Sequence, residues 1–89
     1  MILFVVWKNN PAFKLEIDGS NTVLELKTKI AKHFGETYTG FNILNGADII
    51  DQSRNKDSVS SCGLNRVIRL PDNYNPGALK FLYKNNLDY

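Results

Sequence analysis

The segment over residues 22–35 constrains the fold most, because it predicts one amphipathic helix with a single apolar stripe. Thr22 and Glu25 form a capping-box pattern at its start, and Gly35 follows its end as a C-cap glycine. The apolar residues recur three or four positions apart and so share one helix face. They are Val23, Leu26, Ile30 and Phe34. Such a stripe has to be covered by another layer of the fold.

Strand patterns flank this helix on both sides. Two strands are predicted before it, at residues 2–7 and 12–17, and three after it, at residues 41–44, 47–50 and 66–70. The first strand is continuously apolar, and the second alternates with period two. An Asn–Gly turn pair separates the third strand from the fourth. One helical turn is predicted shortly before the last strand.

We therefore predict an α+β fold in which a mixed four- to five-stranded sheet packs on one helix. The first and last strands are expected to lie adjacent and parallel at the centre of the sheet. We place a domain at residues 1–70 and a C-terminal extension at residues 71–89, with a loop and two helical turns over 78–84. The predicted core is apolar throughout: Leu3, Val5, Phe13, Leu15, Ile17, Val23, Leu26, Ile30, Ile50 and Leu64, with Val67 or Ile68.

Composition excludes several classes of protein. The 89 residues carry 11 basic and 9 acidic side chains, and a net charge of +2 is too small to indicate nucleic-acid or membrane binding. No apolar run approaches the ~20 residues that span a bilayer. Cys62 is the only cysteine, so neither an internal disulfide nor a multi-cysteine zinc site can form. We expect a cytoplasmic or nuclear protein.

No catalytic motif occurs in the sequence. His33 is the only histidine, and we expect it to be solvated or to cap the end of the helix. Cys62 is interpreted as a structural thiol rather than a nucleophile. No phosphate-binding loop, paired carboxylate motif or metal spacing is present. We therefore expect a monomer that is not an enzyme and has no cofactor, metal or small-molecule substrate.

The order of elements and several local sequences resemble the ubiquitin-like β-grasp family. The similarity covers residues 1–70, and Leu15 to Gly35 is its most specific part. It is carried by Met1-Ile-Leu-Phe-Val, Leu15-Glu-Ile-Asp-Gly-Ser-Asn-Thr-Val, Leu26-Lys-Thr-Lys-Ile, Leu44-Asn-Gly-Ala-Asp-Ile-Ile-Asp, Asp57-Ser-Val-Ser-Ser-Cys-Gly-Leu and Arg66-Val-Ile-Arg-Leu. The resemblance implies a module that recognises a protein without covalent attachment. It also implies that the helix covers one face of the sheet and leaves the other face open.

Two departures from the family matter. Conjugated members end in Gly-Gly just past the last strand, because the activating enzyme's channel admits only glycine before the reactive carboxylate. Here Pro71 and Asp72 follow that strand, and no Gly-Gly pair occurs in the sequence. The added extension is the second departure. A covalent modifier or sulfur carrier is therefore the less favoured reading.

The resemblance also implies where a protein partner would bind. The open sheet face of the family carries an apolar patch, for which the candidates are Ile43 or Leu44 and Val67 or Ile68, depending on register. Lys8 and Arg69 are expected to border it. The alternative for each of these apolar residues is that it belongs to the core. The extension's Leu79, Phe81, Leu82 and Tyr83 are a further candidate to cover the patch.

Two alternative functions stay open. Lys27, Lys29 and Lys32 lie off the apolar stripe, where lysines are usually a solvated helix face. In an adaptor of the Ras-binding type they would contact an acidic partner, although Lys27 matches a family position where lysine is partly buried and ion-paired. The second alternative is that the chain is the N-terminal domain of a larger ubiquitin-pathway enzyme, such as a deubiquitinase or ligase.

Overall fold

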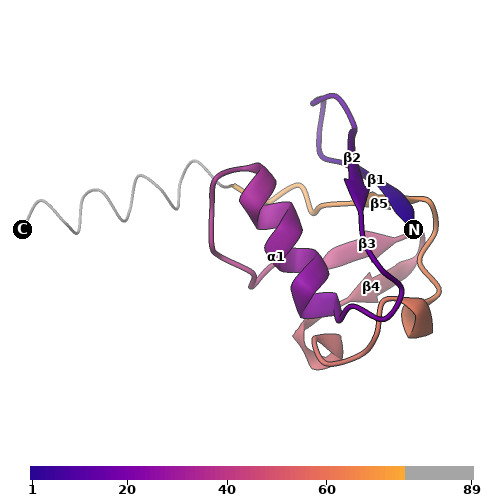
Figure 1. Ribbon diagram of the computed structural model, residues 1–89. Coiled ribbons are helices and arrows are strands. Elements are labelled where there is room, and N and C mark those ends of the chain that lie inside the picture. Colours follow the sequence, from indigo (N-terminus) through magenta and orange to yellow (C-terminus); the bar gives the residue numbers. More distant parts are fainter. Residues whose placement is uncertain (76–89) are drawn as a thin grey trace, which may run out of the picture.

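The computed structural model describes residues 1–75 (Figure 1), so the helix predicted over 78–84 lies outside the described residues. Its elements are β1 (Ile2–Val6), β2 (Phe13–Glu16), α1 (Val23–His33), β3 (Ile43–Asn45), β4 (Asp48–Ile50), the 3₁₀ turns η1 (Gln52–Arg54) and η2 (Ser60–Cys62), and β5 (Val67–Arg69). The predicted order of strands and helix is confirmed, and the class is α+β. The strands after the helix are shorter than predicted.

The sheet has five strands in the order β2-β1-β5-β3-β4. β1 runs antiparallel to β2 and parallel to β5, while β3 runs antiparallel to both β5 and β4. The predicted adjacency of the first and last strands is thus confirmed. Figure 1 shows α1 lying across one face of this sheet.

The capping box starts α1 as predicted. The Glu25 N–H donates to Thr22 Oγ1 at 3.1 Å, and the Thr22 N–H donates to Glu25 Oε1 at 3.1 Å. These bonds satisfy backbone donors that the first turn leaves unpaired. They also lower the pKa of the Glu25 carboxyl below its ordinary value. The cap therefore fixes where the apolar stripe begins.

The core lies between α1 and the sheet and contains most of the predicted residues. Phe13, Leu15 and Leu64 are only partly buried and pack against its border. The buried apolar residues are Leu3, Val5, Ile17, Val23, Leu26, Ile30, Ala31, Phe41, Ile43, Ile50, Val59, Ile68, Leu70 and Tyr74. Of the two alternatives at the last strand, Ile68 is the core residue.

Lys27 is buried under the loop that follows β4. Its Nζ donates to Asn55 Oδ1 at 2.8 Å. Burial lowers the pKa of the Lys27 ammonium, and the nearby Asp51 carboxylate opposes that shift. Lys27 is therefore a structural residue and contributes nothing to an exposed basic surface, because its side chain is not accessible to a partner.

Aromatic rings close the end of the core beside the C-terminus of α1. Phe34 makes edge-to-face contacts with Trp7 at 5.4 Å, Phe13 at 5.6 Å and Tyr74 at 5.5 Å between ring centroids. His33 is exposed, as predicted, and its ring stacks flat on that of Phe13 with 3.7 Å between ring centroids. Offset and edge-to-face ring pairs each add about 0.5–1.5 kcal/mol beyond their buried area. Tyr74 thereby anchors the segment after β5 to the domain.

We expect Leu26→Ala and Ile30→Ala each to lower the free energy of unfolding by about 2–5 kcal/mol, because both side chains are fully buried between α1 and the sheet. Urea denaturation measures this loss. Leu24→Ala is the matched control: Leu24 lies on the same helix but is 42% exposed, so its change should stay near 0.5 kcal/mol. Equal losses in all three variants would contradict the assigned stripe.

The pH dependence of the stability of a Tyr74→Phe variant tests the aromatic anchor. Burial, assisted by the Glu36 carboxylate, raises the pKa of the Tyr74 phenol to about 12, against an ordinary value of 10.0. Between these pH values the unfolded chain loses this proton and the folded chain keeps it, so stability present below pH 10 is lost as pH rises toward 12. The Phe variant should lose less stability over this range.

Below pH 10 the Tyr74→Phe change should cost at most about 1 kcal/mol, because no residue that the structure describes accepts or donates a hydrogen bond at the Tyr74 hydroxyl. Tyr38→Phe, at an exposed tyrosine, is the control and should keep the parent's pH dependence. Denaturation midpoints measured from pH 8 upward provide the comparison. A Tyr74→Phe curve that follows the parent's decline would contradict the burial argument.

Candidate protein-binding face

The sheet face opposite α1 carries the outward side chains of β1. Leu3 and Val5 enter the core, and strand alternation directs Ile2, Phe4 and Val6 to the other face. Ile2 and Phe4 are exposed, while Val6 is half-buried. The continuous apolar character of this strand therefore arises from two apolar faces, of which only one is covered by the helix.

The register of β3 and β5 decides between the predicted alternatives. Ile43 and Ile68 are fully buried on the helix side, so neither is available to a partner. Both are corrections to the candidate set, and the reason is the two-residue period of a strand. Leu44 and Val67 hold the adjacent positions and turn to the opposite face, together with Arg69.

Strand pairing brings these outward residues together. Val67 lies opposite Phe4 across β5 and β1, and Arg69 lies between Val6 and Leu44. Leu44 in turn lies opposite Ile49 of the edge strand β4. We call this surface the open face; it consists of Phe4, Val6, Leu44, Ile49, Val67 and Arg69. Exposed fractions of 40% for Phe4, 56% for Ile49 and 53% for Val67 show that described residues leave it accessible.

Four of the six predicted residues line one cavity. Leu44, Val67, Ile68 and Arg69 border a hollow of about 340 Å³, together with Gly46 and Asn65. β3 and β5 therefore bring together part of the predicted set, without Lys8 and Ile43. Phe4, Val6 and Ile49 were missed by sequence reasoning, although their alternate positions within predicted strands were a signal that could have found them.

Lys8 is not joined to this group by any described contact. It has a positive φ of 50° in the turn after β1, and its Nζ lies 5.3 Å from the centroid of the Trp7 ring. A cation over an indole ring is attracted by the negative face of the π-system. Lys8 is thus exposed at the hairpin turn, where Trp7 holds it on the side of the aromatic cluster.

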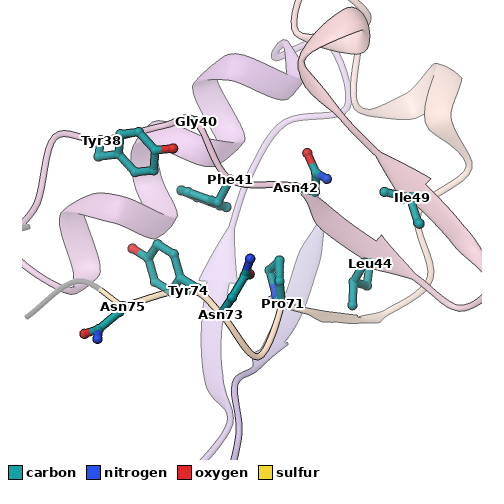
Figure 2. A pocket seen from close by; sticks show the side chains of 10 residues that line it. All are labelled: Tyr38, Gly40, Phe41, Asn42, Leu44, Ile49, Pro71, Asn73, Tyr74 and Asn75. Carbon is teal, nitrogen blue, oxygen red and sulfur yellow. The ribbon is translucent and has the colours of Figure 1, made fainter. Parts of the chain in front are cut away.

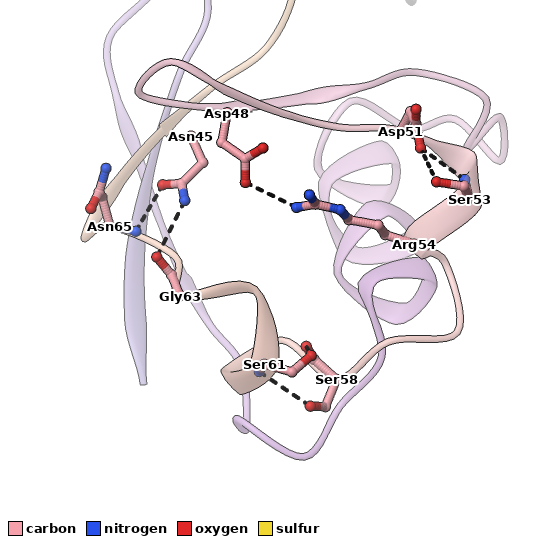
Figure 3. A network of polar contacts seen from close by, with 9 residues as sticks. All are labelled: Asn45, Asp48, Asp51, Ser53, Arg54, Ser58, Ser61, Gly63 and Asn65. Carbon is pink, nitrogen blue, oxygen red and sulfur yellow. Dashed lines mark hydrogen bonds and ion pairs between the residues drawn. The ribbon is translucent and has the colours of Figure 1, made fainter.

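A buried amide fixes the strand that carries Leu44. Asn45 Nδ2 donates to the Gly63 carbonyl at 3.2 Å, and Asn45 Oδ1 accepts from the Asn65 N–H at 2.8 Å (Figure 3). These bonds tie β3 to the turn that precedes β5. An ion pair of 2.9 Å between Arg54 and Asp48 connects β4 to η1 at the exposed edge of the same region.

The charges around the open face are mixed but favour the basic side. Lys14 lies opposite Phe4 in the β1–β2 ladder, and Arg69 occupies the centre of the face. Glu16 is the acidic neighbour on β2. Arg69 was predicted at the border of the patch but lies among its apolar residues. Apolar and aromatic side chains with an arginine among them are typical of protein interfaces.

No protein-family model matches this chain, and a search of curated proteins found no significant match. Within residues 1–75, no helix is long and apolar enough to cross a membrane. In that same range no three His, Cys, Asp or Glu side chains come together in an arrangement that would hold a metal ion. The half-buried Cys62 packs against the core.

Proposed function

We propose that this chain is a ubiquitin-like β-grasp domain that binds a protein partner non-covalently through the open face, without catalysing a reaction. The observation that carries the proposal is the exposure of Phe4, Ile49 and Val67 on the sheet face that the helix leaves uncovered. The sheet has the order β2-β1-β5-β3-β4, and α1 lies between β2 and β3 along the chain. This arrangement supports the assignment to that family. Such an apolar surface on a small domain marks an interaction site.

The open face favours a partner with an apolar centre and an acidic border. Leu44, Val67 and Phe4 supply apolar contacts, and a few buried residues at an interface centre usually dominate its energy. Arg69 stands among them and Lys14 borders them. An acidic group on the partner would pair with these cations, mainly raising the association rate and its dependence on salt.

The proposal includes neither conjugation nor sulfur transfer. Pro71 and Asp72 directly follow Leu70, where the conjugated members of the resembled family need glycines. Tyr74 then enters the aromatic cluster, with contacts to Trp7 at 5.6 Å and Phe41 at 4.8 Å. A segment packed in this way is poorly suited to the extended approach that an activating enzyme requires.

A second candidate is an adaptor of the Ras-binding type, contacted along the edge strand β2. Lys29 of α1 donates from Nζ to the Glu16 carbonyl at 3.1 Å, which brings a helix lysine to that edge. Lys14 lies on the same strand and is exposed. Lysines at a sheet edge also prevent edge-to-edge aggregation, which is why the open face remains our first candidate.

We expect the double variant Leu44→Ala/Val67→Ala to lose retention of a protein partner while circular dichroism stays native. Truncating a central interface residue typically costs about 2 kcal/mol or more of binding free energy. Pull-down from a lysate, with identification of retained proteins by mass spectrometry, measures the effect. Leu24→Ala, at an exposed leucine on α1, is the matched control and should retain the partner.

Two outcomes would contradict the open-face assignment. One is unchanged retention in the Leu44/Val67 variant. The other is loss of retention in a Lys14→Glu/Lys29→Glu variant alone, which would favour the β2 edge and the second candidate. Ile68→Ala is unsuitable for this test, because that side chain is buried in the core and its loss lowers stability itself.

We further expect residues 1–89 to form no ATP-dependent adenylate or thioester with a ubiquitin-like activating enzyme, because Pro71 and Asp72 occupy the place of the required glycines. A non-reducing gel of a charging reaction checks this, with a conjugated family member as the positive control. Appearance of a thiol-sensitive adduct on this chain would revive the modifier hypothesis.

A further inference from the structure

A groove opens where β3 and β5 stop pairing. The last pair in their ladder is Leu44 with Arg69, and the same register would next place Asn42 opposite Pro71. Proline has no N–H to donate to the ladder. The Pro71 carbonyl instead accepts from the Tyr74 N–H at 3.1 Å, in a turn that leads Tyr74 into the aromatic cluster. The two chain segments therefore part after a single pair.

The space between these segments is a cavity of about 410 Å³, which we call the β3–β5 groove (Figure 2). The rings of Phe41 and Tyr74 lie toward one end, and Leu44 and Ile49 lie toward the other. The amide side chain of Asn42 lies between them. The lining combines the apolar side chains of Phe41, Leu44, Ile49 and Pro71 with the amides of Asn42, Asn73 and Asn75. It therefore suits a peptide segment that brings apolar side chains together with backbone groups able to pair with these amides.

The chain supplies such a segment directly beside the groove. Asn75 lines the groove, and residues 76–89 follow it. The first of these are Pro76 and Gly77, a pair typical of a chain-reversing turn. Leu79, Leu82 and Tyr83 come next, at the i, i+3, i+4 spacing of one helix face.

We propose that Leu79, Leu82 and Tyr83 dock into the β3–β5 groove of their own chain. The mode is an amphipathic segment laid in an apolar groove, with its anchors three or four residues apart. The short connection from Asn75 keeps the segment at an effective concentration on the order of millimolar, so even weak contacts hold it in place. A separate peptide would have to be present in solution at that concentration to occupy the groove equally well.

Docking in this groove would regulate the open face, a consequence that rests on the proposed function. Leu44 and Ile49 line the groove and also belong to the open face. A segment seated against them covers part of the surface that a partner needs. The two occupants therefore compete, and release of the segment would raise the affinity for the partner.

Nuclear magnetic resonance on the labelled 89-residue chain tests the docking without any partner. We expect nuclear Overhauser effects from the methyl groups of Leu79 or Leu82 to the rings of Tyr38 or Phe41, unchanged on dilution. In Leu79→Ser/Leu82→Ser these effects disappear and the amide signals of Gly40, Asn42 and Asn73 shift. Tyr89→Ser, near the same end of the chain, is the control and leaves those signals in place.

Absence of these effects in the parent chain, or unshifted groove amides in the double-serine variant, would overturn the docking. Effects that arise only between differently labelled copies would also overturn it, because a second copy would then be the occupant. Retention of a partner is measured separately: the double-serine variant should increase it several-fold. Failure of partner binding in every variant would contradict the proposed function while leaving the resonance result standing.

Discussion

The parallel pairing of β1 with β5 places every other element of the domain. The Phe4 N–H donates to the Arg66 carbonyl at 2.7 Å, and the Leu70 N–H donates to the Val6 carbonyl at 2.9 Å, so the ladder extends beyond both ends of β5. Parallel neighbours require a long crossover connection. Here that connection contains β2, α1, β3 and β4. β2 pairs with the free edge of β1, and β3 pairs with the free edge of β5. The single helix α1 packs on one face of this sheet and leaves the other face open.

The composition of the open face then depends on register, because a slip of one residue exchanges the two faces of a strand. Asn45 opposes such a slip in β3, since its buried amide would lose bonds to Gly63 and Asn65. Leaving a buried polar group unpaired costs about 1–3 kcal/mol. The same two bonds therefore keep Ile43 in the core and Leu44 on the accessible surface.

The local features of this fold could be predicted from sequence, and the facing of its short strands could not. The capping box at Thr22 and the spacing of the apolar helix stripe depend only on residues that are close together in the sequence. By contrast, Val67 and Ile68 are adjacent apolar residues in a three-residue strand, and nothing in that pattern says which turns inward. Pairing with β1 decides it. Burial of Tyr74 had no local signal either, because it lies in a polar loop and its ring partners are distant in sequence.

Pro71 links the groove, the proposed regulation and the expected lack of conjugation. Without an N–H it cannot continue the ladder to β3, and its carbonyl is used by the turn that buries Tyr74. The segment after β5 is thus directed onto the aromatic end of the domain instead of extending from the sheet. That path opens a cavity between the parted segments and brings residue 75 to its edge. We expect a substitution that restored the ladder at this position to close the groove, so the proposed docking of the following segment depends on Pro71.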